Sequence, residues 1–163
     1  MKTGIKIIRL FIEHKEHKTI REIAKQIHAD YKITYIATQR LIEQDILKTE
    51  TVGKSTLCNL NSSYYGVEIY QAENERREQI LTNKSLNLLY KEIMAKINAS
   101  SFIMLLFGSY AKGKQTKTSD IDLLVISNQK DFENKISNIL SLLPLKTHVL
   151  VFTEEEFVRM KDA

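Results

Sequence analysis

A short segment in the second half of the chain combines residue types that bind phosphate and metal. Gly108 and Ser109 follow one apolar run, and ten residues later Asp120 and Asp122 open another. Free backbone N–H groups at a Gly-Ser turn between a strand and a helix suit a phosphate. Side chains alternate along a strand, so we expect the two carboxylates to share a face and to hold Mg²⁺. The segment therefore indicates phosphoryl or nucleotidyl transfer.

The spacing of this segment resembles the signature of the polymerase-β-like nucleotidyltransferase superfamily. The most similar members are the minimal nucleotidyltransferases, which include antitoxin partners of HEPN-type toxins. The resemblance covers about residues 84–160, and it includes a second glycine, Gly113, and the hydrophobic strand that follows Asp122.

The resemblance implies a role for each residue of the segment. Gly108 and Ser109 would hold the triphosphate of an NTP, with ATP favoured, and Lys112 would contact the phosphates. Asp120 and Asp122 would be catalytic and would hold Mg²⁺ or Mn²⁺. The implied reaction transfers a nucleoside monophosphate to a hydroxyl of a protein, such as a HEPN-type toxin, or of an RNA.

One expected residue of this family is missing. Active members usually carry a third carboxylate on the next strand, but residues 146–152 contain no Asp or Glu, and we expect His148 to face the site instead. A neutral imidazole binds metals or accepts a proton, yet it is a poorer Mg²⁺ ligand than a carboxylate. His148 is therefore the third catalytic residue that we predict. The alternative is a DNA-binding regulator whose nucleotidyltransferase domain binds nucleotide or mediates dimerisation without turnover.

The first sixty residues have the pattern of a small helical domain with a hairpin. Apolar spacing predicts helices over 5–16 and 32–44, and the capping box from Thr19 to Glu22 predicts a helix between them. A Gly-centred turn at 53–54 joins two strand-like runs, 46–52 and 55–60. In the third helix the apolar stripe includes Ile33, Ile36, Ala37 and Leu41, with Arg40 in register.

This order of elements resembles the winged helix-turn-helix DNA-binding fold. The resemblance places the third helix in the major groove and the hairpin tip against the backbone of DNA. The residues that we predict to contact DNA are Lys32, Thr34, Tyr35, Thr38, Gln39, Arg40 and Lys54. Winged helices also serve as protein-interaction modules, and that alternative stays open.

We expect an α+β protein of three parts. These are a winged helix of three helices plus a β-hairpin over 1–60, a connector helix over 61–82 that is a possible homodimer contact, and a nucleotidyltransferase-like α/β domain over 83–163. The last part should contain a small mixed sheet with strands at 101–107, 120–127 and 146–152, and helices over 130–142 and from Thr153 onward.

Charge and cysteine content limit the class of protein. Residues 1–60 contain 11 Lys and Arg against 7 Asp and Glu, whereas residues 61–163 contain 13 of each, so the whole net charge of +4 lies in the first part. This asymmetry favours nucleic-acid binding by that part. The one cysteine, Cys58, fits a buried strand position in a reducing compartment. With no long apolar run and no signal peptide, we expect a cytoplasmic protein without membrane contact.

Overall fold

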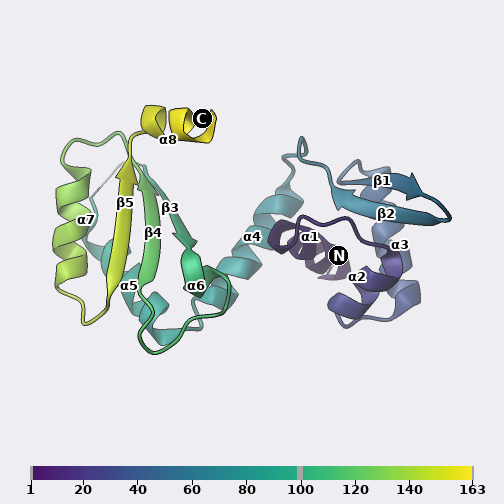
Figure 1. Cartoon of the computed structure of the whole chain (residues 1–163), viewed down its shortest axis with the longest axis horizontal. Coiled ribbons are helices and arrows are strands. Elements are labelled where there is room, and N and C mark those ends of the chain that lie inside the picture. The colour runs from purple at the N-terminus through teal and green to yellow at the C-terminus, as the bar shows by residue number, and fades with distance from the viewer. Residues whose placement is uncertain (1, 99–100, 163) are drawn as a thin grey trace. The chain divides into compact units, whose positions relative to one another are not determined.

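The computed structural model describes residues 2–98 and 101–162. The chain forms two compact units that divide between Gln79 and Ile80 (Figure 1). The architecture is α+β, as predicted: helices and a hairpin come first, and an α/β region follows. In the described residues no helix is both long enough and apolar enough to cross a membrane.

Three helices form the start of the first unit: α1 (Lys2–Glu13), α2 (Ile20–Gln26) and α3 (Tyr31–Glu43). Side-chain caps fix where the second and third helices begin. The Thr19 hydroxyl accepts from the Glu22 N–H while the Glu22 carboxylate accepts from the Thr19 N–H, and the Asp30 carboxylate accepts from the Ile33 N–H. The helices bury one core with α1 at its centre, where Ile7 and Ile8 are fully buried.

A hairpin completes the winged-helix order of elements. Strands β1 (Leu47–Val52) and β2 (Ser55–Leu60) pair antiparallel around a two-residue turn, in which Gly53 has a positive φ of 60°. Lys18 lies before α2 and exchanges two backbone hydrogen bonds with Cys58 of β2, which adds a short third segment to the hairpin. Cys58 is buried in the core, and this burial raises the pKa of its thiol.

Helix α4 (Val67–Ile80) follows the hairpin, and its Ala72 is fully buried in the core of the first unit. The remaining elements of the chain are α5 (Lys84–Lys96), β3 (Ile103–Phe107), α6 (Gly108–Ala111), β4 (Ile121–Ile126), α7 (Phe132–Ser141), β5 (Thr147–Phe152) and α8 (Glu154–Asp162).

The second unit is built on a mixed sheet in the order β3-β4-β5. Strand β4 is central, pairing antiparallel with β3 and parallel with β5. Helices α5 and α7 pack on one face of this sheet, where Ile121, Leu123 and Val125 of β4 are buried (Figure 1). Because strand side chains alternate, Asp122 and Leu124 point to the opposite face. That face carries the predicted site.

Candidate functional site

The turn after β3 lies directly against the carboxylate of Asp122. Gly108 begins the short helix α6 with a φ of +68°, a conformation that L side chains rarely adopt. A Cβ built on Gly108 would overlap Asp122 Oδ2 and lie 2.8 Å from its Cγ. Glycine is therefore required here for two independent reasons, and its backbone lies directly against the Asp122 carboxylate.

Strand register places His148 on the other side of Asp122. Asp122 is paired with Phe107 of β3 and with His148 of β5, so the three residues form a row across the open face. The His148 Nδ1 lies 3.5 Å from Asp122 Oδ1, with 59% of the His148 side chain and 25% of the Asp122 side chain exposed. The two oxygens of Asp122 thus have different neighbours: Oδ2 faces the Gly108 backbone and Oδ1 faces an imidazole.

Asp120 lies outside the strand, contrary to the prediction that the strand begins with it. β4 begins at Ile121, whose N–H donates to the Lys146 carbonyl at 2.8 Å, and the exposed Asp120 belongs to the preceding loop. Strand alternation therefore does not determine the direction of Asp120. The loop is held by its own hydrogen bonds, including one from the Thr116 N–H to the Ser119 hydroxyl at 2.9 Å.

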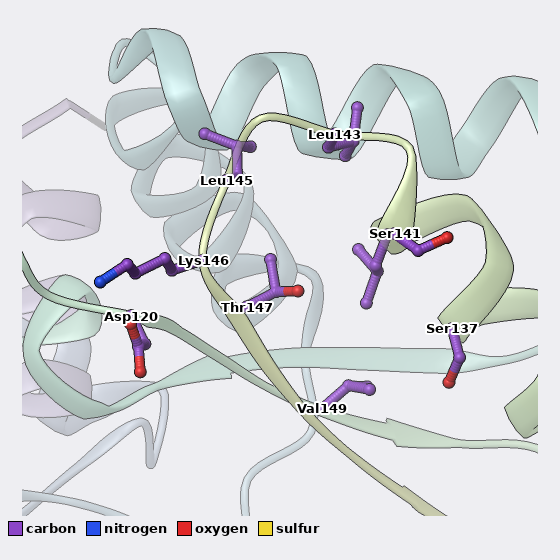
Figure 2. A pocket seen from close by; sticks show the side chains of 9 residues that line it. Asp120, Ser137, Ser141, Leu143, Leu145, Lys146, Thr147 and Val149 are labelled. Carbon is purple, nitrogen blue, oxygen red and sulfur yellow. The ribbon is translucent and has the colours of Figure 1, made fainter.

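A pocket of about 550 Å³ lies beside Asp120, between α7 and the β5 edge of the sheet. Figure 2 shows the Asp120 carboxylate and the Lys146 amine toward one end, and the hydroxyls of Ser137 and Ser141 toward the other. Asp120 is the one predicted site residue in its lining. The pocket therefore adjoins the loop before β4 but does not include the Gly108–Asp122 contact.

The other predicted nucleotide contacts lie at the turn. Ser109 is half-buried within α6, and its carbonyl accepts from the Lys114 N–H at 2.9 Å. Lys112 follows α6 with an exposed side chain, and Gly113 ends the turn with a φ of +64°. The binding role of Ser109 and Lys112 stays a prediction.

The donor set fits a hard divalent cation only in part. Asp120 and Asp122 offer carboxylate oxygens next to a turn suited to phosphate, and such a cation completes its coordination with phosphate oxygens and water. Within residues 2–98 and 101–162 no three His, Cys, Asp or Glu side chains group closely enough to hold a metal by themselves. A cation here would therefore depend on the bound nucleotide for its remaining ligands.

The residues of the first unit that we predict to contact DNA are partly exposed and partly buried. Lys32, Tyr35 and Arg40 of α3 and Lys54 of the hairpin turn are exposed, and Gln39 is half-exposed. Their contacts with DNA stay a prediction.

For two residues of α3 the prediction is wrong. Thr34 and Thr38 are fully buried, and their hydroxyls donate to the carbonyls of Asp30 and Thr34, each at 2.8 Å. Such buried, internally bonded hydroxyls cannot reach a base edge.

The same rotation of α3 contradicts half of its predicted apolar stripe: Leu41 is buried and Ala37 packs against the core, but the two isoleucines face outward. Ile33 and Ile36 are 55% and 45% exposed, while the core side of α3 consists of Thr34, Thr38 and Leu41. A threonine fits a helical core position when its hydroxyl bonds the carbonyl four residues earlier, because no polar group is then left unpaired. The helical spacing i, i+4, i+7 of these three residues is the sequence signal for their shared buried face.

These observations define three helices with a β-hairpin, in the order of a winged helix, followed by an α/β region in which a glycine turn lies against a carboxylate. Residues 89–163 match the nucleotidyltransferase domain family, so this region is a nucleotidyltransferase domain. Among solved structures, the chain is similar to a point mutant of Lactococcus lactis ZitR at 20% identity and a TM-score of 0.41, with 60% of this chain and 62% of that chain covered. No curated protein matches the chain significantly.

Proposed function

We propose that residues 83–163 transfer a nucleoside monophosphate from an NTP, with ATP favoured, to a hydroxyl group of a protein or RNA. A winged helix over residues 1–60 would bind DNA, with residues 61–82 as the connector. The contact between the Gly108 backbone and the Asp122 carboxylate carries the proposal, because it puts a backbone turn suited to a phosphate next to a carboxylate suited to a cation. The family match of residues 89–163 supports it.

The residues of the turn would bind and orient the nucleotide. Gly108 leaves the backbone open to the phosphates, Ser109 offers a hydroxyl and an N–H, and Lys112 adds a positive charge. Asp120 and Asp122 would hold Mg²⁺ or Mn²⁺, which when bound neutralises charge on the phosphate oxygens.

His148 would accept the proton of the acceptor hydroxyl. In the transfer, the hydroxyl oxygen forms a bond to the α-phosphorus, the bond between that phosphorus and the bridging α–β oxygen breaks, and pyrophosphate leaves. The proton passes to the neutral imidazole, and Asp122, whose Oδ1 lies 3.5 Å from Nδ1, stabilises the imidazolium that results.

Transfer of label from an α-³²P-labelled NTP tests this function. The full chain is incubated with Mg²⁺ or Mn²⁺, with each of the four NTPs, and with either the product of the neighbouring gene or total RNA as acceptor. We expect labelled acceptor, and a loss of about 100-fold or more in Asp122→Asn because a cation ligand is removed. Asp131→Asn is the control: Asp131 has a positive φ of 58°, which asparagine tolerates, and its side chain makes no cap hydrogen bond. Absence of label in every arm contradicts transfer.

A second function is favoured by one specific observation. The residue paired with Asp122 is a histidine where a third carboxylate is expected, which suits a domain that binds nucleotide without turnover. The chain would then be a DNA-binding regulator, acting as a monomer or as a homodimer. An antitoxin that represses its own operon would combine nucleotide transfer with DNA binding. This function predicts salt-sensitive binding to the promoter of its own gene together with NTP binding, measured by calorimetry, in the absence of any label transfer.

A further inference from the structure

Helix α3 presents an unusual set of side chains to solvent. Four of its large apolar side chains are about half exposed: Tyr31, Ile33, Tyr35 and Ile36. Single exposed apolar residues are ordinary, but a group of them on one helix marks a binding surface. The buried Thr34, Thr38 and Leu41 fix the rotation of the helix, so this outward group is part of the fold.

Cations and an amide surround the centre of this face. Helical spacing puts Lys32 and Arg40 four residues to either side of Ile36, and Gln39 three residues after it. Tyr35 lies four residues before Gln39, and its ring centroid is 6.3 Å from that of Tyr31. The face therefore combines an apolar centre, one amide and flanking positive charge.

We infer that α3 reads A·T base pairs, with Ile36 contacting a thymine methyl group and Gln39 pairing with the adenine edge. The inference rests on the proposed DNA binding of this unit. An isoleucine cannot bond a phosphate, and the thymine 5-methyl is the one apolar group that base pairs present in the major groove. Glutamine forms its bidentate pair with adenine N6 and N7. Lys32, Arg40 and Lys54 of the hairpin turn would hold the phosphates that flank these pairs.

The charge of the unit favours DNA over a protein partner. The chain's net positive charge lies in residues 1–60, and the exposed cations Lys32 and Arg40 interrupt the apolar group on α3 itself. The centres of protein–protein interfaces are depleted in charged residues, lysine in particular. A polyanion with isolated methyl groups matches this face better than an apolar protein surface does.

Modified bases test the inference directly. DNA duplexes that bind the full chain are first selected from a library with a random central sequence. The selected duplex is then synthesised again with one modified base at a time. Uracil in place of thymine removes only the methyl group, and 7-deazaadenine in place of adenine removes only the N7 acceptor. We expect about a fourfold loss of affinity at one or two uracil positions, the effect of burying one methyl group. We expect about a tenfold loss at one 7-deazaadenine position.

Variants assign each effect to a side chain. Ile36→Ala should bind the thymine and uracil duplexes equally, and Gln39→Ala should bind the adenine and 7-deazaadenine duplexes equally. Both should keep salt-sensitive binding to DNA of unrelated sequence. Ile103→Ala is the matched control, since Ile103 is an exposed isoleucine of the nucleotidyltransferase domain, and it should lose affinity for the uracil duplex as the unmodified chain does.

Three results would overturn the inference, and they separate it from the proposed function. Salt-sensitive binding with no loss at any uracil position keeps DNA binding but removes methyl recognition. No binding to any duplex at low salt removes both. If Ile36→Ala leaves every affinity unchanged but shifts the sedimentation coefficient of the chain, the face is a protein contact.

Discussion

The outward face of α3 and the turn at Gly108 differ in what holds their residues in place. At the turn, the pairing of Phe107 with Asp122 brings Gly108 beside the Asp122 carboxylate, and a Cβ added at Gly108 would overlap that carboxylate. On α3, no single contact decides which residues face outward; the rotation follows from the whole buried side, including Thr34 and Thr38. The comparison shows that a site built on strand register depends on one position, whereas a helix face depends on many.

The largest expected effect separates two glycines of the same turn. Gly108 and Gly113 both have a positive φ, but a Cβ at Gly113 would meet nothing within 4 Å, while one at Gly108 would overlap Asp122. Both alanine variants carry similar backbone strain, about 1–2 kcal/mol. We expect Gly108→Ala to lower label transfer by about 100-fold or more, because Asp122 must move, and Gly113→Ala to lower it only slightly. Equal losses of transfer in the two variants would show that the strain, and not the contact, matters.

The next effect concerns the histidine beside Asp122. His148→Ala should lower label transfer by about 100-fold, the usual contribution of a general base. His148→Asp supplies the carboxylate that the family resemblance leads us to expect, and it should shift the metal preference toward Mg²⁺ relative to Mn²⁺, because carboxylates suit harder cations. The measurement is the initial rate of transfer with each metal across a pH series. Full activity of His148→Ala at every pH would remove the histidine from the reaction.

The contrast between the two regions also explains which features could be predicted from the sequence. The resemblance of the segment from Gly108 to Asp122 to the nucleotidyltransferase signature implies that the two residues share a site, and the pairing of Phe107 with Asp122 places them side by side. The position of Asp120 outside the strand could not be predicted in this way, because the hydrogen bond from the Ile121 N–H to the Lys146 carbonyl decides where the strand begins. The buried Thr34 and Thr38 could not be found from polarity, because burial depends on hydrogen bonds that form only in the helix. The pocket beside Asp120 depends on how α7 packs against β5, which no local pattern encodes.

A smaller effect distinguishes the two sides of α3. Arg40→Ala should lower the affinity for DNA and reduce the slope of log affinity against log salt by about one, because one phosphate contact is lost. Thr38→Val should leave DNA affinity unchanged and lower the free energy of unfolding by about 1 kcal/mol, because the hydrogen bond to the Thr34 carbonyl is lost. Binding titrations at three salt concentrations and amide hydrogen exchange of α3 measure both quantities. A loss of DNA affinity in Thr38→Val without loss of stability would contradict the buried position.

The smallest effect compares two identical helix caps. Thr19 with Glu22 opens α2, and Thr153 with Glu156 opens α8, and in each the glutamate accepts from the threonine N–H at 2.8 Å. α2 buries Ile23 and Ala24 in the core, whereas α8 is mostly exposed. We expect Thr19→Ala to lower the stability of the first unit by roughly 1 kcal/mol. Thr153→Ala should only speed amide exchange within α8, because little of the second core depends on that helix.

The pH dependence of the same caps supplies an independent check. Hydrogen bonds from the backbone N–H and then the hydroxyl of the threonine hold the pKa of Glu22 and of Glu156 below the ordinary value. A carboxylate with a lowered pKa stabilises the folded state above its unfolded pKa, about 4.3, and that stabilisation is lost as the pH falls through the lowered value. Acidification from pH 6 to pH 3 should therefore speed amide exchange in both α2 and α8. The slowly exchanging core amides should exchange faster only in the first unit. In Glu22→Gln this acceleration in the first unit should be smaller. Equal responses of the two cores would mean that α8 supports the nucleotidyltransferase domain as strongly as α2 supports the winged helix.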